Sequence, residues 1–198
     1  MGKKVLVFDF FGVICSEIAP CWLQKYFSPE MATQINGEIV TLADTGDISQ
    51  DELFRELARL AKITPEKAQE EWLSLVQINP AVVGLITDLA PMFRVSLLTN
   101  SPAPFVRGIM NKHGLESHFE YILVSAEVRI AKPDPRVFRR MLTSLGAQPD
   151  DAVMIDDNPA NIAGAESIGM KGILFKSASQ LRQKILDMNF TPKRAQPK

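Results

Sequence analysis

Polar side chains follow several apolar runs of this sequence, at the point where each run ends. An aspartate closes the run VLVF, a threonine and an asparagine follow VSLL, and two aspartates follow VMI. A lysine stands in the segment AKPDP, downstream of the run YILV. The set comprises an isolated carboxylate, a hydroxyl beside an amide, a cation and an acidic pair: Asp9, Thr99, Asn100, Lys132, Asp156 and Asp157.

This combination of groups suits phosphoryl transfer. A carboxylate can attack phosphorus and form an acyl phosphate, while a hydroxyl, loop N–H groups and a lysine hold the phosphoryl oxygens. Adjacent aspartates can bind Mg²⁺, a hard cation that prefers carboxylate and water oxygens, and the metal brings an anionic substrate to an anionic nucleophile. Simpler interpretations stay open, because residues 99–101 are also typical of a helix N-cap and residues 156–159 of a turn.

The elements that would position these groups are short strands alternating with helices. Five apolar runs rich in β-forming residues lack polar/apolar alternation, which is typical of strands buried on both faces of a parallel sheet. They are residues 5–10, 95–100, 121–124, 152–157 and 172–175. Segments between them end in glycines that are typical helix stops, at Gly114, Gly146 and Gly169. The pattern predicts an α/β, Rossmann-like, doubly wound sheet with the polar residues gathered at one edge.

The region between the first two predicted strands is long and helical in character. Residues 49–52, SQDE, form a capping box before the segment LFRELARLAKI, and Thr64 with Pro65 begins another helix. An insertion of this kind predicts a small all-helical cap. The predicted domains are a core at residues 1–15 and 80–190, a cap at residues 16–79 and a loose, basic C-terminal tail at residues 191–198.

Composition narrows the class of protein. The chain has 198 residues, of which 46% are apolar and 23% charged, with a formal net charge of −1. This profile is typical of a globular protein and disfavours a nucleic-acid partner. No apolar run approaches the roughly 18 residues of a membrane-spanning helix, and no signal peptide is expected. We therefore expect a cytoplasmic protein with no membrane partner; the sequence does not indicate an oligomeric state.

The order of the four polar motifs resembles that of the haloacid dehalogenase superfamily of hydrolases. VFDFFGVI, LLTNS, AKPDP and MIDDNPANIAGA are similar to its first to fourth motifs, and the helical insertion stands where its small C1-type cap stands. Each motif alone is weak, whereas four in order across residues 3–176 are a specific signal. The combination most resembles the branch of small sugar-phosphate phosphatases, which includes the bacterial alpha-glucose-1-phosphate phosphatase, and the N-terminal phosphatase domains of epoxide hydrolases.

The resemblance implies Mg²⁺-dependent hydrolysis of a small phosphorylated metabolite, such as a sugar phosphate, through an aspartyl phosphate on Asp9. Lys132 would bridge the phosphate and the carboxylate, and Asn161, one helical turn after Asp157, is a candidate support for the acidic pair. The implied catalytic residues are Asp9 and Lys132, the implied phosphate-binding residues are Thr99, Asn100 and Lys132, and the implied metal ligands are Asp9, Asp156, Asp157 and the backbone carbonyl of Phe11.

Phe11 departs from the phosphatase pattern of that superfamily. An acid usually stands two residues after the nucleophile, where it protonates the leaving alcohol and then activates water. A phenyl ring transfers no proton, and general acid–base catalysis typically contributes ~10²–10⁴ in rate. Glu17, just beyond the first motif, is one candidate substitute, although a solvated residue of the cap is the simpler interpretation of it.

Three functions are compatible with Phe11. The favoured one is a working phosphatase whose proton comes from another residue or from water, or whose leaving group needs little help. The second is a metal-independent 2-haloacid dehalogenase, in which an aromatic residue stands at this place and halide leaves unprotonated. The adjacent acids 156 and 157 argue against it, because they repel each other without a cation. The third is a catalytically impaired protein that binds phosphate or a phosphorylated metabolite.

Overall fold

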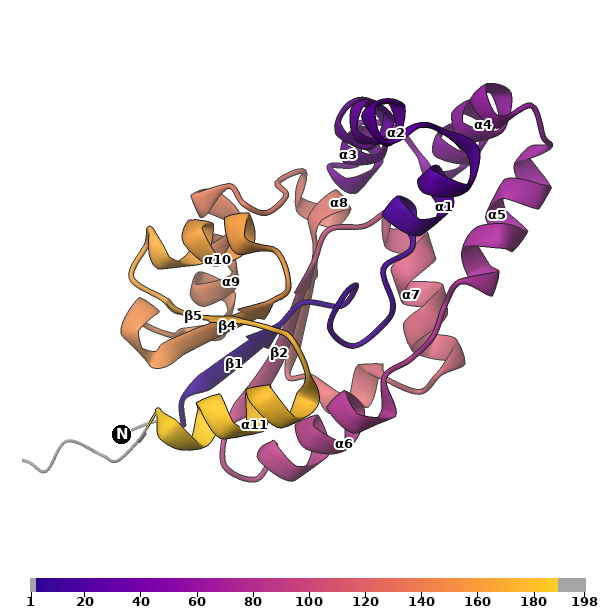
Figure 1. Cartoon of the computed structure of the whole chain (residues 1–198). Helices are drawn as coiled ribbons and strands as arrows, with labels where there is room; N and C mark the ends of the chain where they lie inside the picture. The colour runs from indigo at the N-terminus through magenta and orange to yellow at the C-terminus, as the bar shows by residue number, and fades with distance from the viewer. Residues whose placement is uncertain (1–2, 189–198) are drawn as a thin grey trace, which may run out of the picture.

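The computed structural model describes residues 3–188 and contains a parallel sheet with helices on both faces (Figure 1). The sheet order is β3-β2-β1-β4-β5, and each neighbouring pair is parallel. The strands are β1 (Val5–Phe8), β2 (Arg94–Thr99), β3 (Tyr121–Val124), β4 (Ala152–Asp156) and β5 (Lys171–Leu174). The predicted α/β, Rossmann-like fold is confirmed. The predicted tail at 191–198 lies outside the described residues, as does the end of the predicted core at 190.

Four strands end earlier than their apolar runs predict. β2 ends at Thr99 rather than at residue 100, and β5 ends at Leu174 rather than at residue 175. β1 ends at Phe8 rather than at residue 10, and β4 ends at Asp156 rather than at residue 157. The backbone N–H of Asp9 still donates to the carbonyl of Ile155 (2.9 Å), but the chain then turns into a loop closed by a hydrogen bond from Ile14 N to Phe10 O (2.8 Å). The acidic residues therefore stand where the strands give way to loops.

Core helices cover both faces of the sheet. The side chains of Leu6 and Phe8 point to one face and those of Val5 and Val7 to the other, and both sets are buried, so the run shows no alternation. The helices are α6 (Pro80–Leu89), α7 (Ala103–Lys112) and α11 (Ala178–Asp187) on the first face, α9 (Pro135–Leu145) and α10 (Pro159–Glu166) on the second, and the short α8 (Ser125–Val128), η2 (Glu116–His118) and η3 (Pro149–Asp151) in the connections.

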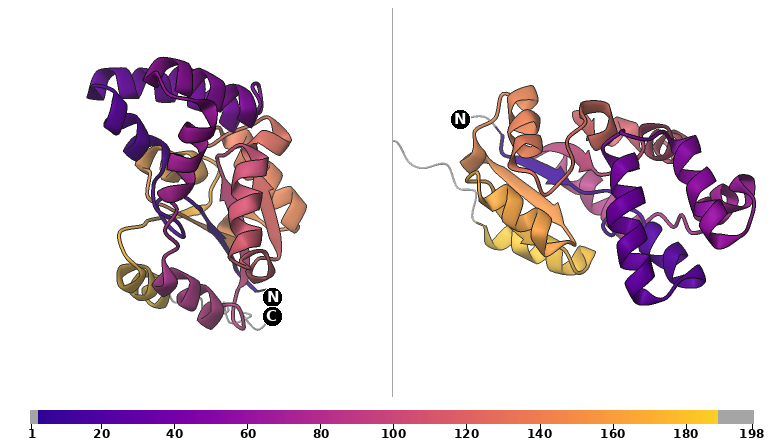
Figure 2. Two further views of the ribbon diagram at one scale, coloured as in Figure 1. Left: turned by 90° about the vertical axis from the view of Figure 1, so that its right-hand side faces the viewer. Right: turned by 90° about the horizontal axis from the view of Figure 1, so that it is seen from above.

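The chain between β1 and α6 is helical, as predicted. Its elements lie together beyond the carboxyl ends of the strands (Figures 1 and 2). Ser49 and Glu52 form the capping box, and Thr64 caps a helix whose first residue is Pro65. The elements are α1 (Ala19–Tyr26), α2 (Pro29–Ile35), the π-helical turn η1 (Asn36–Val40), α3 (Thr41–Asp44), α4 (Gln50–Ala61) and α5 (Pro65–Ser74).

The two linkers that join these helices to the core pair with each other. Ser16 N donates to Gln77 O (2.9 Å), and Asn79 N donates to Ile14 O (2.8 Å). Apolar side chains from the helical insertion and from the sheet belong to one buried cluster. We retain residues 16–79 as a proposed cap domain. Across residues 3–188, every helix falls short of the length and apolar character that crossing a bilayer requires.

Glu71 joins two helices of the proposed cap. Its carboxylate accepts hydrogen bonds from Trp22 Nε1 (2.8 Å) and Tyr26 Oη (2.8 Å) of α1, and it forms an ion pair with Lys25 Nζ (2.9 Å). The hydrogen bond from Lys25 is the largest influence, and together with those from Tyr26 and Trp22 it outweighs desolvation. The pKa of Glu71 consequently falls from 4.5 to about 2. An acid whose pKa is lower in the folded state stabilises the fold while it is ionised.

We expect Glu71→Gln to lower the free energy of unfolding at neutral pH. The wild-type advantage is present above pH 4.5 and is lost as the pH falls from there toward about 2. Urea unfolding of both proteins at several pH values measures it. Glu70→Gln, an exposed neighbour on α5, is the matched control and should leave stability unchanged. A wild-type advantage that stays constant far below pH 4.5 would contradict the assignment.

Candidate active site

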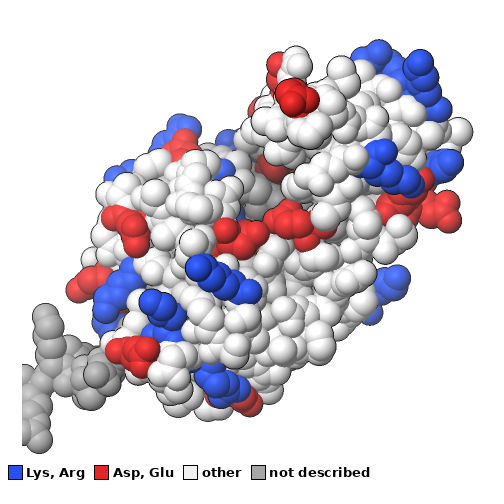
Figure 3. Space-filling model, in the orientation of Figure 1, with Lys and Arg blue, Asp and Glu red and all other residues white. Residues whose placement is uncertain are grey.

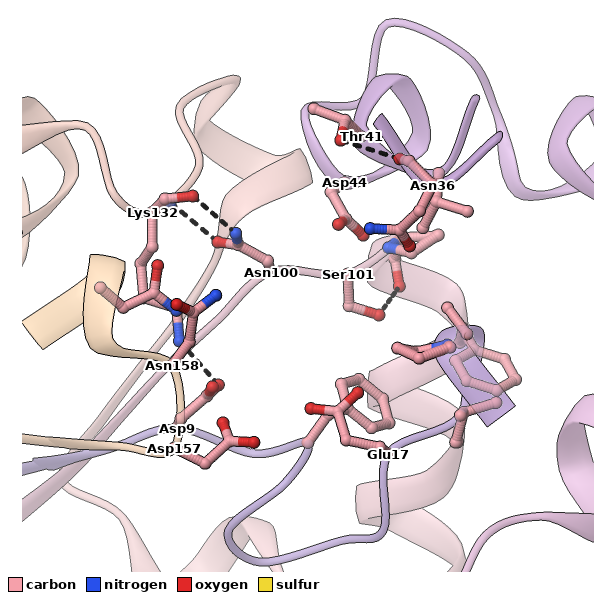
Figure 4. A pocket seen from close by; sticks show the side chains of 18 of the residues that line it. Asp9, Glu17, Asn36, Thr41, Asp44, Asn100, Ser101, Lys132, Asp157 and Asn158 are labelled. Atoms are coloured by element: carbon pink, nitrogen blue, oxygen red, sulfur yellow. Dashed lines mark hydrogen bonds and ion pairs between the residues drawn. The ribbon is translucent and has the colours of Figure 1, made fainter. Parts of the chain in front are cut away.

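A cavity of about 630 Å³ opens at the carboxyl ends of the strands, between the sheet and the helical insertion. Figure 3 shows this hollow with acidic side chains beside it, and Figure 4 shows its lining. Asp9, Asn100, Lys132 and Asp157 line it from core loops, and Asp44 lines it from α3. Four of the six polar residues that the sequence singles out therefore face one space, as expected where parallel strands end.

Lys132 is buried between two carboxylates. Its Nζ lies 2.7 Å from Asp9 Oδ1 and 2.7 Å from Asp156 Oδ2, and all three side chains are almost completely buried. Burial by itself lowers the pKa of Lys132, but the charges of Asp9 and Asp156 and their hydrogen bonds outweigh it, so the net shift is upward. Lys132 is therefore a permanent cation at the floor of the cavity. Burial raises the pKa of Asp9 and Lys132 opposes that effect.

Asp156 is occupied entirely by donors from the protein. Its Oδ1 accepts from Asn158 N (2.9 Å) and from Asn161 Nδ2 (3.0 Å), and its Oδ2 accepts from Lys132 Nζ. The side chain is fully buried and is absent from the lining of the cavity. In this arrangement Asp156 holds Lys132 in place, and Asn161 holds Asp156 rather than Asp157.

Asp157 is half-buried and faces the cavity. One oxygen from each of Asp9, Asp156 and Asp157 lies within 4.8 Å of the others, which is a grouping that can hold a metal ion. Glu17 also lines the cavity. Burial, followed by the charges of Asp157 and Asp156, raises the pKa of Glu17 to about 7, with Lys132 opposing the shift. Burial likewise raises the pKa of Asp157.

The amide of Asn100 is used by the backbone of Lys132. Asn100 Nδ2 donates to Lys132 O (2.9 Å), and Lys132 N donates to Asn100 Oδ1 (2.9 Å). Asn100 therefore fixes the loop that carries the lysine, and the second N–H of its amide stays available at the cavity, which Asn100 lines. Thr99 is fully buried, and its hydroxyl has no hydrogen-bond partner among the described residues. Thr99 is absent from the lining of the cavity, and Ser96 of the same strand has a buried hydroxyl that likewise lacks a partner among the described residues.

Phe11 stands two residues after Asp9, where the sequence resemblance leads one to expect an acid, and its ring makes an aromatic contact instead. Its ring lines the cavity and stacks on Phe105 of α7, with ring centroids 6.2 Å apart. Phe105 in turn contacts Trp72 of α5 (5.7 Å) and Phe54 of α4 (6.3 Å). This aromatic cluster connects the core loop to the helical insertion. Phe11 therefore contributes packing where a second carboxylate would otherwise stand.

Apart from Glu17, sequence reasoning missed the polar residues that the helical insertion contributes to the cavity. Asn36, Thr41 and Asp44 lie along the continuous helical stretch α2–η1–α3 and line the cavity opposite Lys132 (Figure 4). The π-helical turn alters the register, and a hydrogen bond from Thr41 Oγ1 to Asn36 O (3.0 Å) spans it. The step of five residues from Asn36 to Thr41 departs from α-helical periodicity, so the sequence pattern does not place these side chains on one face. Ser125, whose hydroxyl donates to the carbonyl of Asp44 and so joins the core to α3, directly follows β3 and could have been found from the sequence, because the other polar residues also follow strands.

The chain belongs to the haloacid dehalogenase-like hydrolase family, whose model matches residues 3–169. Among curated relatives, it is 31% identical to a phosphoserine phosphatase of Thermus thermophilus over 132 residues, which cover 63% of this chain and 53% of that protein. The chain spans about half the length of the curated relatives it matches.

Solved structures of the same family share the fold. A predicted family hydrolase from Porphyromonas gingivalis superimposes with a TM-score of 0.79 at 21% identity, covering 96% of this chain and 99% of that one. A family enzyme from Bacteroides thetaiotaomicron, solved in complex with magnesium and inorganic phosphate, gives a TM-score of 0.74 at 23% identity, covering 88% and 95%. At these identities the likeness establishes the fold alone.

Gly12 allows the first loop to pass close to Asp157. Its φ is +78°, and a Cβ at this position would lie 2.2 Å from Asp157 Oδ2. We expect Gly12→Ala to destabilise the protein, since left-handed backbone alone costs a non-glycine residue roughly 1–2 kcal/mol and the carboxylate must also move. Urea unfolding measures the effect.

Gly84→Ala is the matched control for Gly12→Ala. Gly84 lies inside α6 with nothing within 4 Å of an added Cβ, so the same substitution should stabilise the protein by up to about 1 kcal/mol. Equal effects of the two substitutions would refute the close approach of the first loop to Asp157.

Proposed function

We propose that the protein hydrolyses a small phosphate monoester in a Mg²⁺-dependent reaction that proceeds through an aspartyl phosphate on Asp9. The observation that carries the proposal is the buried Lys132 between Asp9 and Asp156, with the Asp157 carboxylate beside it at the cavity. A carboxylate held against a cation, next to a metal-binding acid, is suited to attack phosphorus within an anionic substrate.

The acidic residues fit a hard divalent cation. Three carboxylate oxygens converge within 4.8 Å, and burial raises the pKa of Asp9 and of Asp157, so an added positive charge would relieve an unfavourable concentration of acid. Asp9, Asp157 and the backbone carbonyl of Phe11 would bind Mg²⁺. Asp156, whose oxygens bind Lys132, would lie behind these ligands and add its negative charge to the metal site. The ion would neutralise phosphoryl charge and draw the substrate to the nucleophile.

The side chains of the site divide the remaining work. Asp9 Oδ1 accepts from Phe10 N (2.7 Å) and from Lys132 Nζ (2.7 Å), which fixes the orientation of the carboxylate. Lys132 would also hold a phosphoryl oxygen, and the second N–H of the Asn100 amide would donate to another. The helical insertion covers the cavity, and its closure would exclude water during attack by the nucleophile.

The comparisons support a phosphatase. A phosphoserine phosphatase is among the relatives, and the Bacteroides enzyme binds magnesium and inorganic phosphate in its structure. The amide of Asn36 and the hydroxyl of Thr41 face the cavity from the insertion. Groups of this kind suit hydroxyls on a leaving group, which favours a small sugar phosphate or similar polyol phosphate as the substrate.

The proposal predicts Mg²⁺-dependent phosphate release from an aryl phosphate such as 4-nitrophenyl phosphate. A chelator should abolish release and added Mg²⁺ should restore it. Asp9→Asn keeps the shape of the side chain but removes the nucleophile, so it should lower turnover by more than about 10³-fold. Asp88→Asn, an exposed aspartate on α6 that pairs with Arg182, is the matched control and should retain wild-type turnover.

A second candidate, a phosphate-binding protein without turnover, rests on the aromatic ring of Phe11 at the usual place of the acid. It predicts that inorganic phosphate binds in calorimetry while wild type, Asp9→Asn and the control release no phosphate. That result would refute the proposed hydrolysis. Turnover that survives Asp9→Asn would refute the assigned nucleophile.

A further inference from the structure

A phosphatase that lacks an acid at residue 11 needs a proton for its leaving alcohol from elsewhere. Two carboxyl groups outside the nucleophile and the acidic pair line the cavity, Glu17 and Asp44. Glu17 lies on the side of the cavity where Asp157 stands (Figure 4), and after burial the charge of Asp157 is the largest influence on its pKa, so Glu17 belongs to the metal side of the site. Within residues 3–188, no side chain or backbone group donates a hydrogen bond to the Asp44 carboxyl and none forms an ion pair with it. Asp44 is therefore the carboxyl that is available to the substrate.

The position of Asp44 is fixed by the core rather than by its own helix alone. Ser125 Oγ donates to the carbonyl of Asp44, and the same hydroxyl accepts from Ser101 N (3.1 Å). Ser125 is fully buried. Ser101 directly follows Asn100, whose side chain is hydrogen-bonded to the loop that contains Lys132. The hydrogen bonds therefore form a continuous connection from the loop after β2, through the start of α8, to the end of α3.

A second contact stabilises the same junction. Gly46, with φ +72°, passes so close to α8 that an added Cβ would lie 2.7 Å from the carbonyl of Ala126. The turn after α3 is thus fitted to the start of α8, and this contact places Asp44 at the cavity. Figure 4 shows Asp44 on the ribbon of the insertion, across the cavity from Lys132 and next to Asn36.

We propose that Asp44 is the proton donor and acceptor of the reaction, supplied by the helical insertion in place of an acid at residue 11. This inference rests on the proposed function. Burial raises the pKa of Asp44 to about 7, with Lys132 opposing and Glu17 assisting the shift. A pKa near neutrality suits a group that must both give and take a proton.

Phosphoryl transfer to Asp9 and hydrolysis of the aspartyl phosphate are the two steps of the reaction. An oxygen of Asp9 attacks phosphorus and the bond from phosphorus to the alkyl oxygen breaks, while the Asp44 proton passes to that oxygen, directly or through one water. The alcohol leaves, with an aspartyl phosphate on Asp9 and a carboxylate on Asp44. Water then attacks phosphorus and gives a proton to Asp44, and the bond from phosphorus to Asp9 breaks. Phosphate leaves, and both side chains return to their starting forms.

The test compares a substrate that needs a proton with one that does not. Ethyl phosphate has a poor leaving group and no hydroxyl for the insertion to bind, whereas 4-nitrophenyl phosphate leaves unprotonated. We expect Asp44→Asn to lower turnover of ethyl phosphate by ~10²–10⁴. With 4-nitrophenyl phosphate, rapid mixing should show a burst of one nitrophenol per site and then slow turnover, because the aspartyl phosphate forms but is not hydrolysed.

The controls separate this inference from its rivals. Asp51→Asn, an exposed aspartate of α4, should behave as wild type, and inhibition of Asp44→Asn by inorganic phosphate checks that the variant is folded. A burst in Glu17→Gln but not in Asp44→Asn, or equal losses on both substrates in the rate of the first, phosphoryl-transfer step of Asp44→Asn, would overturn the assignment of Asp44. No loss on ethyl phosphate would do the same and leave Asp44 without a proton role. Failure of the wild type on both substrates would instead refute the proposed function, and this inference with it.

Discussion

The ammonium of Lys132, buried between Asp9 and Asp156, is the constraint on which the rest of the site depends. A buried cation is tolerated only when opposite charges and hydrogen bonds replace the water that it has lost. The ion pairs that compensate the buried cation bring together the end of β1, the end of β4 and the loop after α8. Asn100, at the end of β2, fixes the backbone of the lysine from the remaining side. The sheet order, with β1 between β2 and β4, makes these contacts possible.

The two faces of the cavity have different chemical characters. The core face carries the cation and the converging acids, and hydrogen bonds or ion pairs hold Lys132, Asp9 and Asp156 in place. The face from the insertion carries Asn36, Thr41 and Asp44, whose side chains are free of such fixed partners among the described residues apart from the turn made by Thr41. The aromatic cluster around Phe11 and Phe105 joins the two faces. An aromatic residue at position 11 therefore contributes to packing against the proposed cap and gives the site an apolar wall.

Much of the fold and of the core site could be predicted from the sequence, because both follow from local pattern. Strands buried on both faces give continuous apolar runs, and the end of each run marks the edge at which Asp9, Asn100 and Asp157 meet. The division of labour between Asp156 and Asp157 could not be predicted, since adjacent acids look alike until Asn158, Asn161 and Lys132 are seen to surround the first. Asp44 was hidden for another reason: its approach depends on a π-helical turn and on a hydroxyl 81 positions away in sequence.

The central claim is that the Asp9 carboxylate becomes covalently phosphorylated. The most direct measurement is an acid quench during turnover of 4-nitrophenyl phosphate, followed by peptide mapping with mass spectrometry. The account predicts one phosphoryl group on the peptide that contains Asp9, present with Mg²⁺ and absent with a chelator or in Asp9→Asn. Phosphate release with no phosphorylated protein at any time, or a phosphoryl group on a different residue, would contradict it.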